Sequence, residues 1–213
     1  MDESCDILLR AWTEPGTWSH QGEHFDLKDV CIYPKAVQEP HPKLWISARN
    51  AAAVRRVVRL RTPLLLPPPS FIEDESAVFA GYAAGLRDAG EDPTDTARFA
   101  VGGTMNVVVT DDPEAYRAKI RDAVRHRAQM YGKWLATADD VAGDANRDGQ
   151  RKAPGRPAGV VGTAQECIAA IEDLVSSVVP YTHIVMRVEG VEELEQCAKH
   201  IIPHFAASDP VGP

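Results

Sequence analysis

The sequence predicts an α/β fold in which strands and helices alternate and the strands form a parallel sheet. Short runs such as "LWIS" at 44–47 and "LLL" at 64–66 are apolar on both faces, which is typical of buried parallel strands. Between these runs lie stretches with helical periodicity, and strict alternation of strand and helix favours right-handed parallel crossovers. The 213 residues suffice for one well-buried domain, so we expect a single domain over residues 1–213.

The N-terminal part predicts a helix followed by a small extended excursion. Residues 2–12, "DESCDILLRAW", place apolar side chains along one broad face, as a short helix would, and Pro15 follows as a stop signal. The stretch 17–37 then alternates apolar and polar residues between turn signals. This pattern favours an antiparallel hairpin or extended excursion with Gly22 at its bend.

The rest of the chain predicts four βα units. The predicted strands are residues 43–48, 64–66, 97–110 and 181–190, and the predicted helices are residues 51–61, 73–90, 111–138, 163–179 and 191–205. Thr163 and Glu166 have the spacing of a capping box at a helix start. Residues 143–159 are polar and rich in Gly, Pro and Arg, which predicts a flexible loop. Four units make half of an eight-stranded barrel or a small doubly wound sheet, and periodicity leaves both open.

The composition argues against several function classes. The net charge is −8, whereas a nucleic-acid or anionic-membrane surface needs a basic face, so neither partner is expected. No apolar run reaches the roughly 20 residues that span a bilayer. The N-terminus is acidic where a secretory signal is basic, so we expect a cytoplasmic protein. The four cysteines and seven histidines show no zinc-ligand spacing, so no metal site is expected and the thiols should be reduced.

A series of segments carries a further signal: "RAWTEPGTWSHQGEHFDL" at 10–27, "IYPKAVQEPHPKLWISARNAAAVRRVVRL" at 32–60, "LLLPPP" at 64–69, and "GVVGTAQECIAAIEDLV" followed by "YTHIVMR". In this order they resemble the C-terminal half of luciferase-like monooxygenases, the flavin- or deazaflavin-dependent (β/α)8 family. The family motifs before the fifth strand match Trp12, Thr13, Gly22, Phe25, Pro34, Gln38, Pro40 and Pro42. One departure is Arg61-Thr62-Pro63, where the family often has Gly-Asp-Gly.

The resemblance implies a partial (β/α)8 TIM barrel consisting of roughly the last four βα units. Family enzymes have about 130–150 residues before the matching point, so it also implies a truncated or shortened member. The implied activity is that of a flavin- or F420-dependent oxidoreductase or monooxygenase, with FMN or coenzyme F420 as cofactor. The alternative is a non-catalytic half-barrel, either a remnant or an interaction module, because no acid–base pair is evident.

The implied cofactor site lies where the strand 43–48 meets the following helix, because barrel active sites lie at the C-terminal ends of strands. The resemblance places the cofactor phosphate on Ala48, Arg49, Asn50 and Ala51. Free N–H groups, the positive end of a helix and a guanidinium all favour a phosphate. The structural alternative is that Asn50 is an ordinary N-cap and Arg49 a solvated side chain.

Two residues are candidates for the substrate side of the site. His24 lies on the excursion, which in relatives is near the barrel opening. Arg187 ends the last strand, where it either faces an anionic ligand inside the barrel or makes a surface salt bridge. His183, in the middle of that strand, is expected to be packed, and no catalytic residue is assigned.

The expected partners are a small-molecule substrate and a second protein chain. A half-barrel would leave two sheet edges unpaired, and its inner face, built from apolar runs, would be uncovered. We therefore expect a homo-oligomer or a complex with a partner chain.

Overall fold

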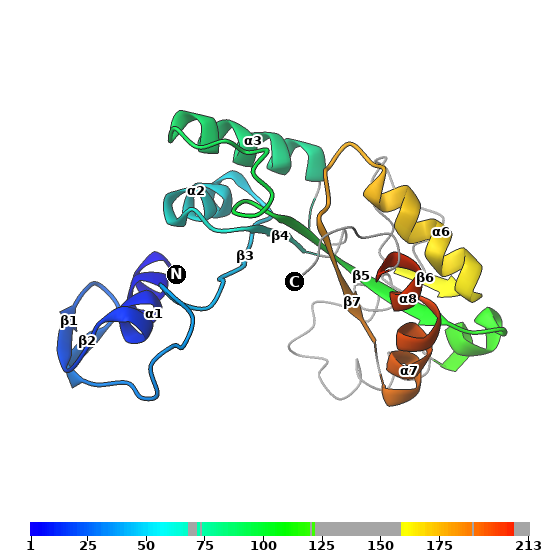
Figure 1. The fold of residues 1–213 in the computed structure, drawn as a ribbon, viewed down its shortest axis with the longest axis horizontal. Coiled ribbons are helices and arrows are strands. Elements are labelled where there is room, and N and C mark those ends of the chain that lie inside the picture. The colour runs from blue at the N-terminus through cyan, green and yellow to red at the C-terminus, as the bar shows by residue number, and fades with distance from the viewer. Residues whose placement is uncertain (68–71, 73, 120, 122–158, 189, 207–213) are drawn as a thin grey trace. The chain divides into compact units, whose positions relative to one another are not determined.

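The computed structural model describes residues 1–67, 72, 74–119, 121, 159–188 and 190–206 of the chain (Figure 1). The predictions for most of the helix 111–138 and for nearly all of the loop 143–159 lie outside these residues. The chain divides into two compact units, Met1–Trp45 and Ile46–Pro213, and each is described by itself. Within the described ranges, no helix is both long and apolar enough to cross a membrane.

The first unit consists of a helix and an antiparallel strand pair. Helix α1 (Asp2–Thr13) precedes strands β1 (Trp18–Gln21) and β2 (Asp26–Val30), which lie in the region where the alternation predicts a hairpin. The side chain of Arg10 lies over the ring of the buried Trp18, with 4.5 Å between the guanidinium carbon and the ring centroid. This contact ties the helix to the hairpin.

The turn of the hairpin is built around the carboxylate of Glu3 on α1. Glu3 Oε2 accepts a hydrogen bond from the backbone N–H of His24 at 3.0 Å, and Oε1 accepts one from Phe25 at 3.1 Å. The Nε2 atom of His20 lies 2.9 Å from Glu3 Oε1. A Cβ atom on Gly22 would overlap this carboxylate, so a larger residue at the bend would displace the Glu3 side chain from its present position.

The second unit is an α/β fold with a parallel sheet, which confirms the fold class. Its strands are β3 (Ile46–Ser47), β4 (Leu64–Leu66), β5 (Val101–Val109), β6 (Gly159–Gly162) and β7 (His183–Arg187). Its helices are α2 (Ala51–Leu60), α3 (Glu75–Asp88), α6 (Ala164–Val175), α7 (Val191–His200) and α8 (Ile202–Ala206), and residues 113–119 are also helical. Three helices begin at the side-chain caps Asn50, Asp74 and Thr163, and the Thr163–Glu166 capping box is confirmed.

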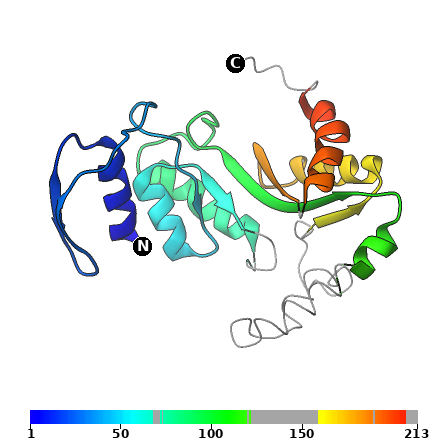
Figure 2. The same ribbon diagram turned by 90° about the horizontal axis from the view of Figure 1, so that it is seen from below.

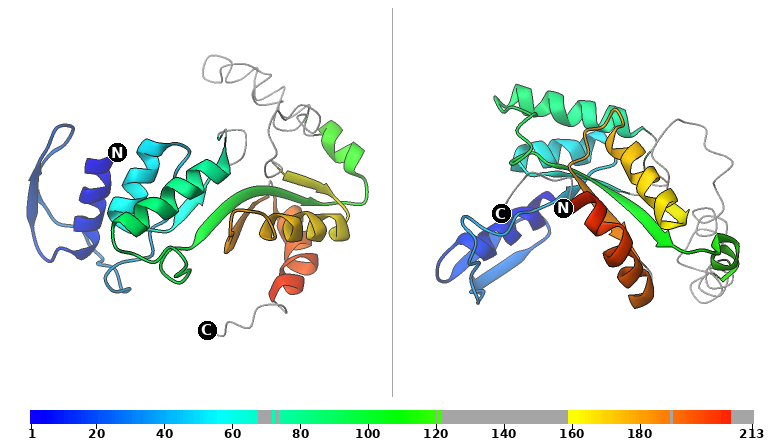
Figure 3. Two further views of the ribbon diagram at one scale, coloured as in Figure 1. Left: turned by 90° about the horizontal axis from the view of Figure 1, so that it is seen from above. Right: turned by 45° about the vertical axis from the view of Figure 1, so that its right-hand side comes forward.

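Strand β5 is the centre of this sheet (Figures 1 and 2). Its first part pairs with β4, which in turn pairs with β3, and its last part pairs with β6. Asn106 is the partner of both Gly159 on β6 and Arg187 on β7. Because a strand has two edges, β6 and β7 lie on opposite edges of β5. Figure 3 shows α6 and α7 beside the carboxyl half of this strand.

Strand β6 was not predicted. Gly159 was expected in a loop and the next three residues just before a helix, because four residues with two glycines carry little strand signal. The structure forms the strand through tertiary pairing, since the peptides of β6 extend the ladder of β5 as far as the bond from Thr110 N to Gly162 O, 2.8 Å. At Gly159 a Cβ atom would lie 2.7 Å from the Cβ of Asn106, so the glycine permits this pairing.

The two faces of the parallel sheet differ sharply. The apolar core lies on one face, where helices α2, α3, α6 and α7 contribute Val57, Tyr82, Ile171 and Cys197, and the strands contribute Leu64, Leu66, Met105 and Val107. The residues between these in the strands point to the other face. We call that face, formed by Ser47, Leu65, Gly102, Thr104, Asn106, His183, Val185 and Arg187, the open face, because none of them belongs to the core cluster.

The open face corrects one expectation from the sequence. The strands were expected to be apolar on both sides, but on the open face most residues are polar or glycine. In β7 the exposed residues alternate with half-buried ones along "HIVMR", and the exposed set is His183, Val185 and Arg187. An uncovered apolar surface is therefore much smaller than the sequence suggested.

Candidate functional site

The register of the strands brings polar residues from distant parts of the sequence together on the open face. Ser47 pairs with Leu65, which pairs with Gly102, and Gly102 pairs with His183. Two residues further along, Thr104 pairs with Val185. Paired residues of a parallel ladder point to the same face, so each set of paired side chains forms a row in which neighbours on adjacent strands lie about 4.8 Å apart.

Arg187 and Asn106 form the last row of the open face, at the carboxyl end of β7. The two residues are direct partners in the ladder. Arg187 is exposed and Asn106 is half-buried. Among the described residues, neither side chain has a hydrogen-bond or ion-pair partner. Of the two alternatives for Arg187, the surface salt bridge is therefore not found in the described part of the chain.

His183 corrects another expectation. It was expected to be packed because it lies inside an apolar run, but its side chain is exposed on the open face. Its Nδ1 atom lies 2.9 Å from the hydroxyl oxygen of Thr182. Thr182 in turn pairs with the backbone of Val101, donating from Oγ1 to its carbonyl at 3.1 Å and accepting from its N–H at 3.0 Å. These bonds hold the imidazole at the amino end of β7.

The junction between β3 and α2 has the geometry of a capped helix start. Ala48 is buried and donates its N–H to the carbonyl of Leu65 at 3.1 Å, while Arg49, Asn50 and Ala51 are exposed. The side-chain oxygen of Asn50 accepts the N–H of Ala53 at 3.0 Å. Asn50 is thus the N-cap, as the structural alternative predicts. The phosphate site at this junction stays a prediction.

The four junction residues and Arg187 belong to the second unit, whereas His24 belongs to the first. The side chain of His24 is exposed, and its backbone N–H is held by Glu3. Its role on the substrate side stays a prediction.

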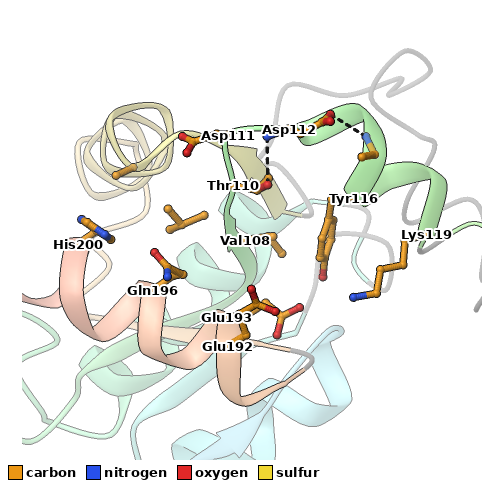
Figure 4. Close-up of a pocket in the computed structure, with 13 residues that line it drawn as sticks. Val108, Thr110, Asp111, Asp112, Tyr116, Lys119, Glu192, Glu193, Gln196 and His200 are labelled. Carbon is orange, nitrogen blue, oxygen red and sulfur yellow. Dashed lines mark hydrogen bonds between the residues drawn. The ribbon is translucent and has the colours of Figure 1, made fainter.

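A separate groove of about 540 Å3 lies at the carboxyl end of β5 (Figure 4). Its walls come from the end of β5, the helical residues 113–119, the start of α6 and one side of α7. The lining side chains include Val108, Tyr116, Lys119, Glu192, Glu193 and His200. The groove contains none of the predicted site residues, and its charges are mixed, so it does not by itself indicate a ligand class.

Two buried cysteines have their thiols close to backbone carbonyls near the carboxyl end of β5. The thiol of Cys167 lies 3.4 Å from the carbonyl oxygen of Val108, and that of Cys197 lies 3.9 Å from the carbonyl oxygen of Val107. Burial raises the pKa of Cys167 to about 11 and also raises the pKa of Cys197. Both thiols are therefore protonated at neutral pH and are poor nucleophiles. In the described part of the chain, no group of three or more His, Cys, Asp or Glu residues is arranged to hold a metal ion.

Asn106 lies inside the predicted strand 97–110, but its pairing with Arg187 was not predicted. A signal was available, because His183, Val185 and Arg187 alternate with apolar residues in a period of two. That alternation predicts one face of the strand away from the core. The partner strand and the register could not be read from the sequence, since they depend on tertiary pairing.

Comparison with known proteins connects this arrangement to one family. The model of the luciferase-like monooxygenase family matches residues 1–180. No curated protein sequence matches the chain significantly. Among solved structures, monooxygenase RslO1 from Streptomyces bottropensis is 22% identical, with a TM-score of 0.66 over 96% of this chain and 60% of that one.

Two further structures share the fold. The coenzyme F420-dependent tetrahydromethanopterin reductase from Methanopyrus kandleri is 15% identical, with a TM-score of 0.59 over 95% of this chain and 62% of that one. The oxygenating constituent of 3,6-diketocamphane monooxygenase from Pseudomonas putida, a type II Baeyer–Villiger monooxygenase in complex with FMN, is 14% identical. Its TM-score is 0.59 over 94% of this chain and 61% of that one.

These structural likenesses show the fold, because the identities are low. The chain spans only 60–62% of the length of the three structures. The family assignment rests on the sequence model, which covers most of the chain from its first residue through the turn before β7. The chain therefore belongs to the luciferase-like monooxygenase family.

Proposed function

We propose that the protein is a flavin- or F420-dependent oxidoreductase whose cofactor phosphate binds at the start of α2. The observation that carries this proposal is the exposed, uncrowded helix start beside the polar open face of a parallel sheet. Support comes from the family and from two structural neighbours, one an F420-dependent reductase and the other in complex with FMN.

The residues at the start of α2 fit a phosphate. The first N–H groups of a helix have no intrahelical acceptor, and of these the group of Ala53 is taken by Asn50. The N–H groups of Ala51 and Ala52 remain for a ligand, and the methyl side chains there do not crowd it. The guanidinium of Arg49 is exposed next to them and, among the described residues, has no carboxylate partner. Such donors and the positive helix end favour an anion.

In this proposal, the bound cofactor supplies hydride transfer or activation of O2, and the protein's residues bind and orient. The junction Ala48–Ala51 anchors the phosphate, and Gly102 and Thr104 of the open face contribute little side-chain bulk on the side proposed for a flat ring. Arg187 and His24 are the proposed substrate-side residues. No described residue is assigned as a proton donor or acceptor.

We further propose that the parallel sheet is part of a (β/α)8 barrel, with the open face as part of its interior. The support is the sheet with its helices on one face, and the alignment of this chain with 60% of the length of RslO1. A barrel of this kind has its helices outside and its ligands at the carboxyl ends of the strands. This is the end at which the β3–α2 junction and Arg187 lie.

The test is a titration of the full chain with FMN, F420 and riboflavin, followed by flavin fluorescence or isothermal calorimetry. We expect saturable binding of FMN or F420, and weaker binding of riboflavin, which lacks the phosphate. Arg49→Gln should weaken FMN binding by roughly 10- to 150-fold, the range for a charge-assisted hydrogen bond of about 1.5–3 kcal/mol. Arg55→Gln, an exposed arginine on the same helix, should have no effect. Absence of saturable binding of both cofactors would refute the proposal.

A non-catalytic half-barrel remains the second candidate function. The observation that favours it is the lack of a carboxylate or cysteine among the eight residues of the open face, so that no acid–base pair is formed there. Under this alternative, neither cofactor binds and a partner chain covers the open face. The same titration therefore separates the two candidates.

A further inference from the structure

We propose that Arg187 and Asn106 together bind the anionic group of an organic acid substrate on the open face. The inference rests on the proposed function in assuming that the open face holds the substrate. It adds the chemical class of that substrate and the two residues that recognise it.

The geometry of the ladder brings the two side chains to one point. Asn106 and Arg187 are direct partners on neighbouring parallel strands and point to the same face. One side chain offers two N–H groups of a carboxamide and the other offers the planar donor fork of a guanidinium. A carboxylate placed over this row can accept from both, because its two oxygens match the spacing of the guanidinium donors.

The charge of Arg187, like that of Arg49, is not neutralised by an ion pair with a described carboxylate. Arg10, Arg61, Arg98 and Arg117 each make an ion pair with a glutamate, at nitrogen–oxygen distances of 2.6–2.9 Å. Arg187 makes no such pair with the described residues.

The described residues of the open face carry no negative charge. The open face contains no Asp or Glu among its residues, although the whole chain has a net charge of −8. In an acidic protein, a face with one arginine and no carboxylate favours an anion over a cation or a neutral ligand.

The rest of the face indicates the shape of the ligand. In the rows before Arg187 lie Val185, which is 45% exposed, and the small residues Thr104 and Gly102. An apolar body can lie over Val185 while its acidic end reaches Arg187. The fit is therefore an organic acid with an apolar body, and benzoate is a suitable probe.

The anionic group has a second conceivable source, the phosphate of the cofactor. The proposed phosphate anchor lies at the β3–α2 junction, on the first strand of the sheet, whereas Arg187 lies on a strand at the other side of β5. Two separate anions, one on each side of the face, are what a cofactor and an acidic substrate would require. The experiment distinguishes these sources.

The experiment is a titration of the isotope-labelled full chain by NMR, observing the Nε–H signal of Arg187 and the carboxamide signals of Asn106. Benzoate is the probe, and benzamide is its uncharged control. We expect both sets of signals to follow one binding curve with benzoate and to stay in place with benzamide. Arg187→Gln should weaken benzoate binding at least tenfold, Arg187→Lys less, and Arg55→Gln not at all.

Several results would overturn the inference: no response of Arg187 to benzoate, an equal response to benzamide, or an equal loss in the Arg55 variant. It is also overturned if Arg187→Gln weakens FMN binding but leaves riboflavin binding unchanged, because the anion would then be the cofactor phosphate. If benzoate binds as expected while neither FMN nor F420 binds, the proposed function fails and the anion site stands.

Discussion

The substitution Asn50→Asp should separate the two roles of the α2 start, because it keeps the cap and adds a negative charge. Asp is as good an N-cap as Asn, so the bond from the N–H of Ala53 is retained. A carboxylate also interacts favourably with the positive helix end, which contributes about 0.3–1 kcal/mol. Stability should therefore be unchanged or slightly higher.

Binding of a phosphate at the same place should become weaker. A bound phosphate at the N–H groups of Ala51 and Ala52 would lie one residue from the new charge. Two unit charges about 5 Å apart repel by roughly 1–3 kcal/mol at effective dielectric constants between 80 and 20. Since Asn50 is exposed, we expect a value near the lower end, a loss of about five- to thirty-fold in FMN affinity.

The assay pairs urea unfolding with FMN and riboflavin titrations at low and high salt. Asn50→Ser, which is a neutral cap, is the matched control and should bind FMN like the natural protein. The loss in Asn50→Asp should shrink at high salt and should be absent for riboflavin. Equal FMN affinity in the Asp and Ser variants would contradict the placement of the phosphate at this helix start.

Three further predictions concern stability and assembly. Tyr82→Phe removes a buried hydrogen bond of 2.8 Å to the carbonyl of Thr62 and should cost about 1–2 kcal/mol in urea unfolding, whereas the exposed Tyr33→Phe should not. The hydrogen bond to His20, with two backbone bonds, lowers the pKa of Glu3, so the stabilisation that its carboxylate gives the hairpin turn is present above pH about 4.5 and is lost as pH falls through the folded pKa. After correction for the intrinsic exchange rate at each pH, the protection of the turn amides against hydrogen exchange should fall in acid, whereas in Glu3→Gln it should not change with pH. The outer edges of β3 and β7 are unpaired among the described strands, so light scattering of the full chain should detect self-association, and a monodisperse monomer would contradict this.

Local features of this fold, such as helix caps, were predicted from the sequence better than the pairing of its strands and the exposure of its two sheet faces. The capping box at Thr163 was predicted correctly, and the cap at Asn50 was one of the two alternatives considered, because caps depend on residues within one turn of the chain. The strand "LLL" was found because the run is continuous. By contrast, β6 is a strand because it pairs with the end of β5. Its four residues contain no local pattern that predicts this pairing.

The positions of the proposed site residues in the fold were predictable to a similar extent. The rule that ligands bind at strand ends selected Arg187 and the β3–α2 junction from the sequence. The exposure of His183 and the pairing of Asn106 with Arg187 were not predicted. Both depend on which face of β7 the helices cover, and that is decided by residues far away in the chain.

The central position of β5 has a consequence for how the protein folds. This strand pairs with β4, β6 and β7, and some of its contacts close very long loops, such as the bond between Val101 and Thr182, 81 residues apart. Contacts of such separation form slowly, because the ordering of the intervening chain must precede any gain. Three strands thus pair with one central strand, and a proline in the middle of β5, which removes a ladder hydrogen bond there, should destabilise the sheet. The amides of β5 should accordingly be among the slowest to exchange with solvent, and they should open only when the whole unit unfolds.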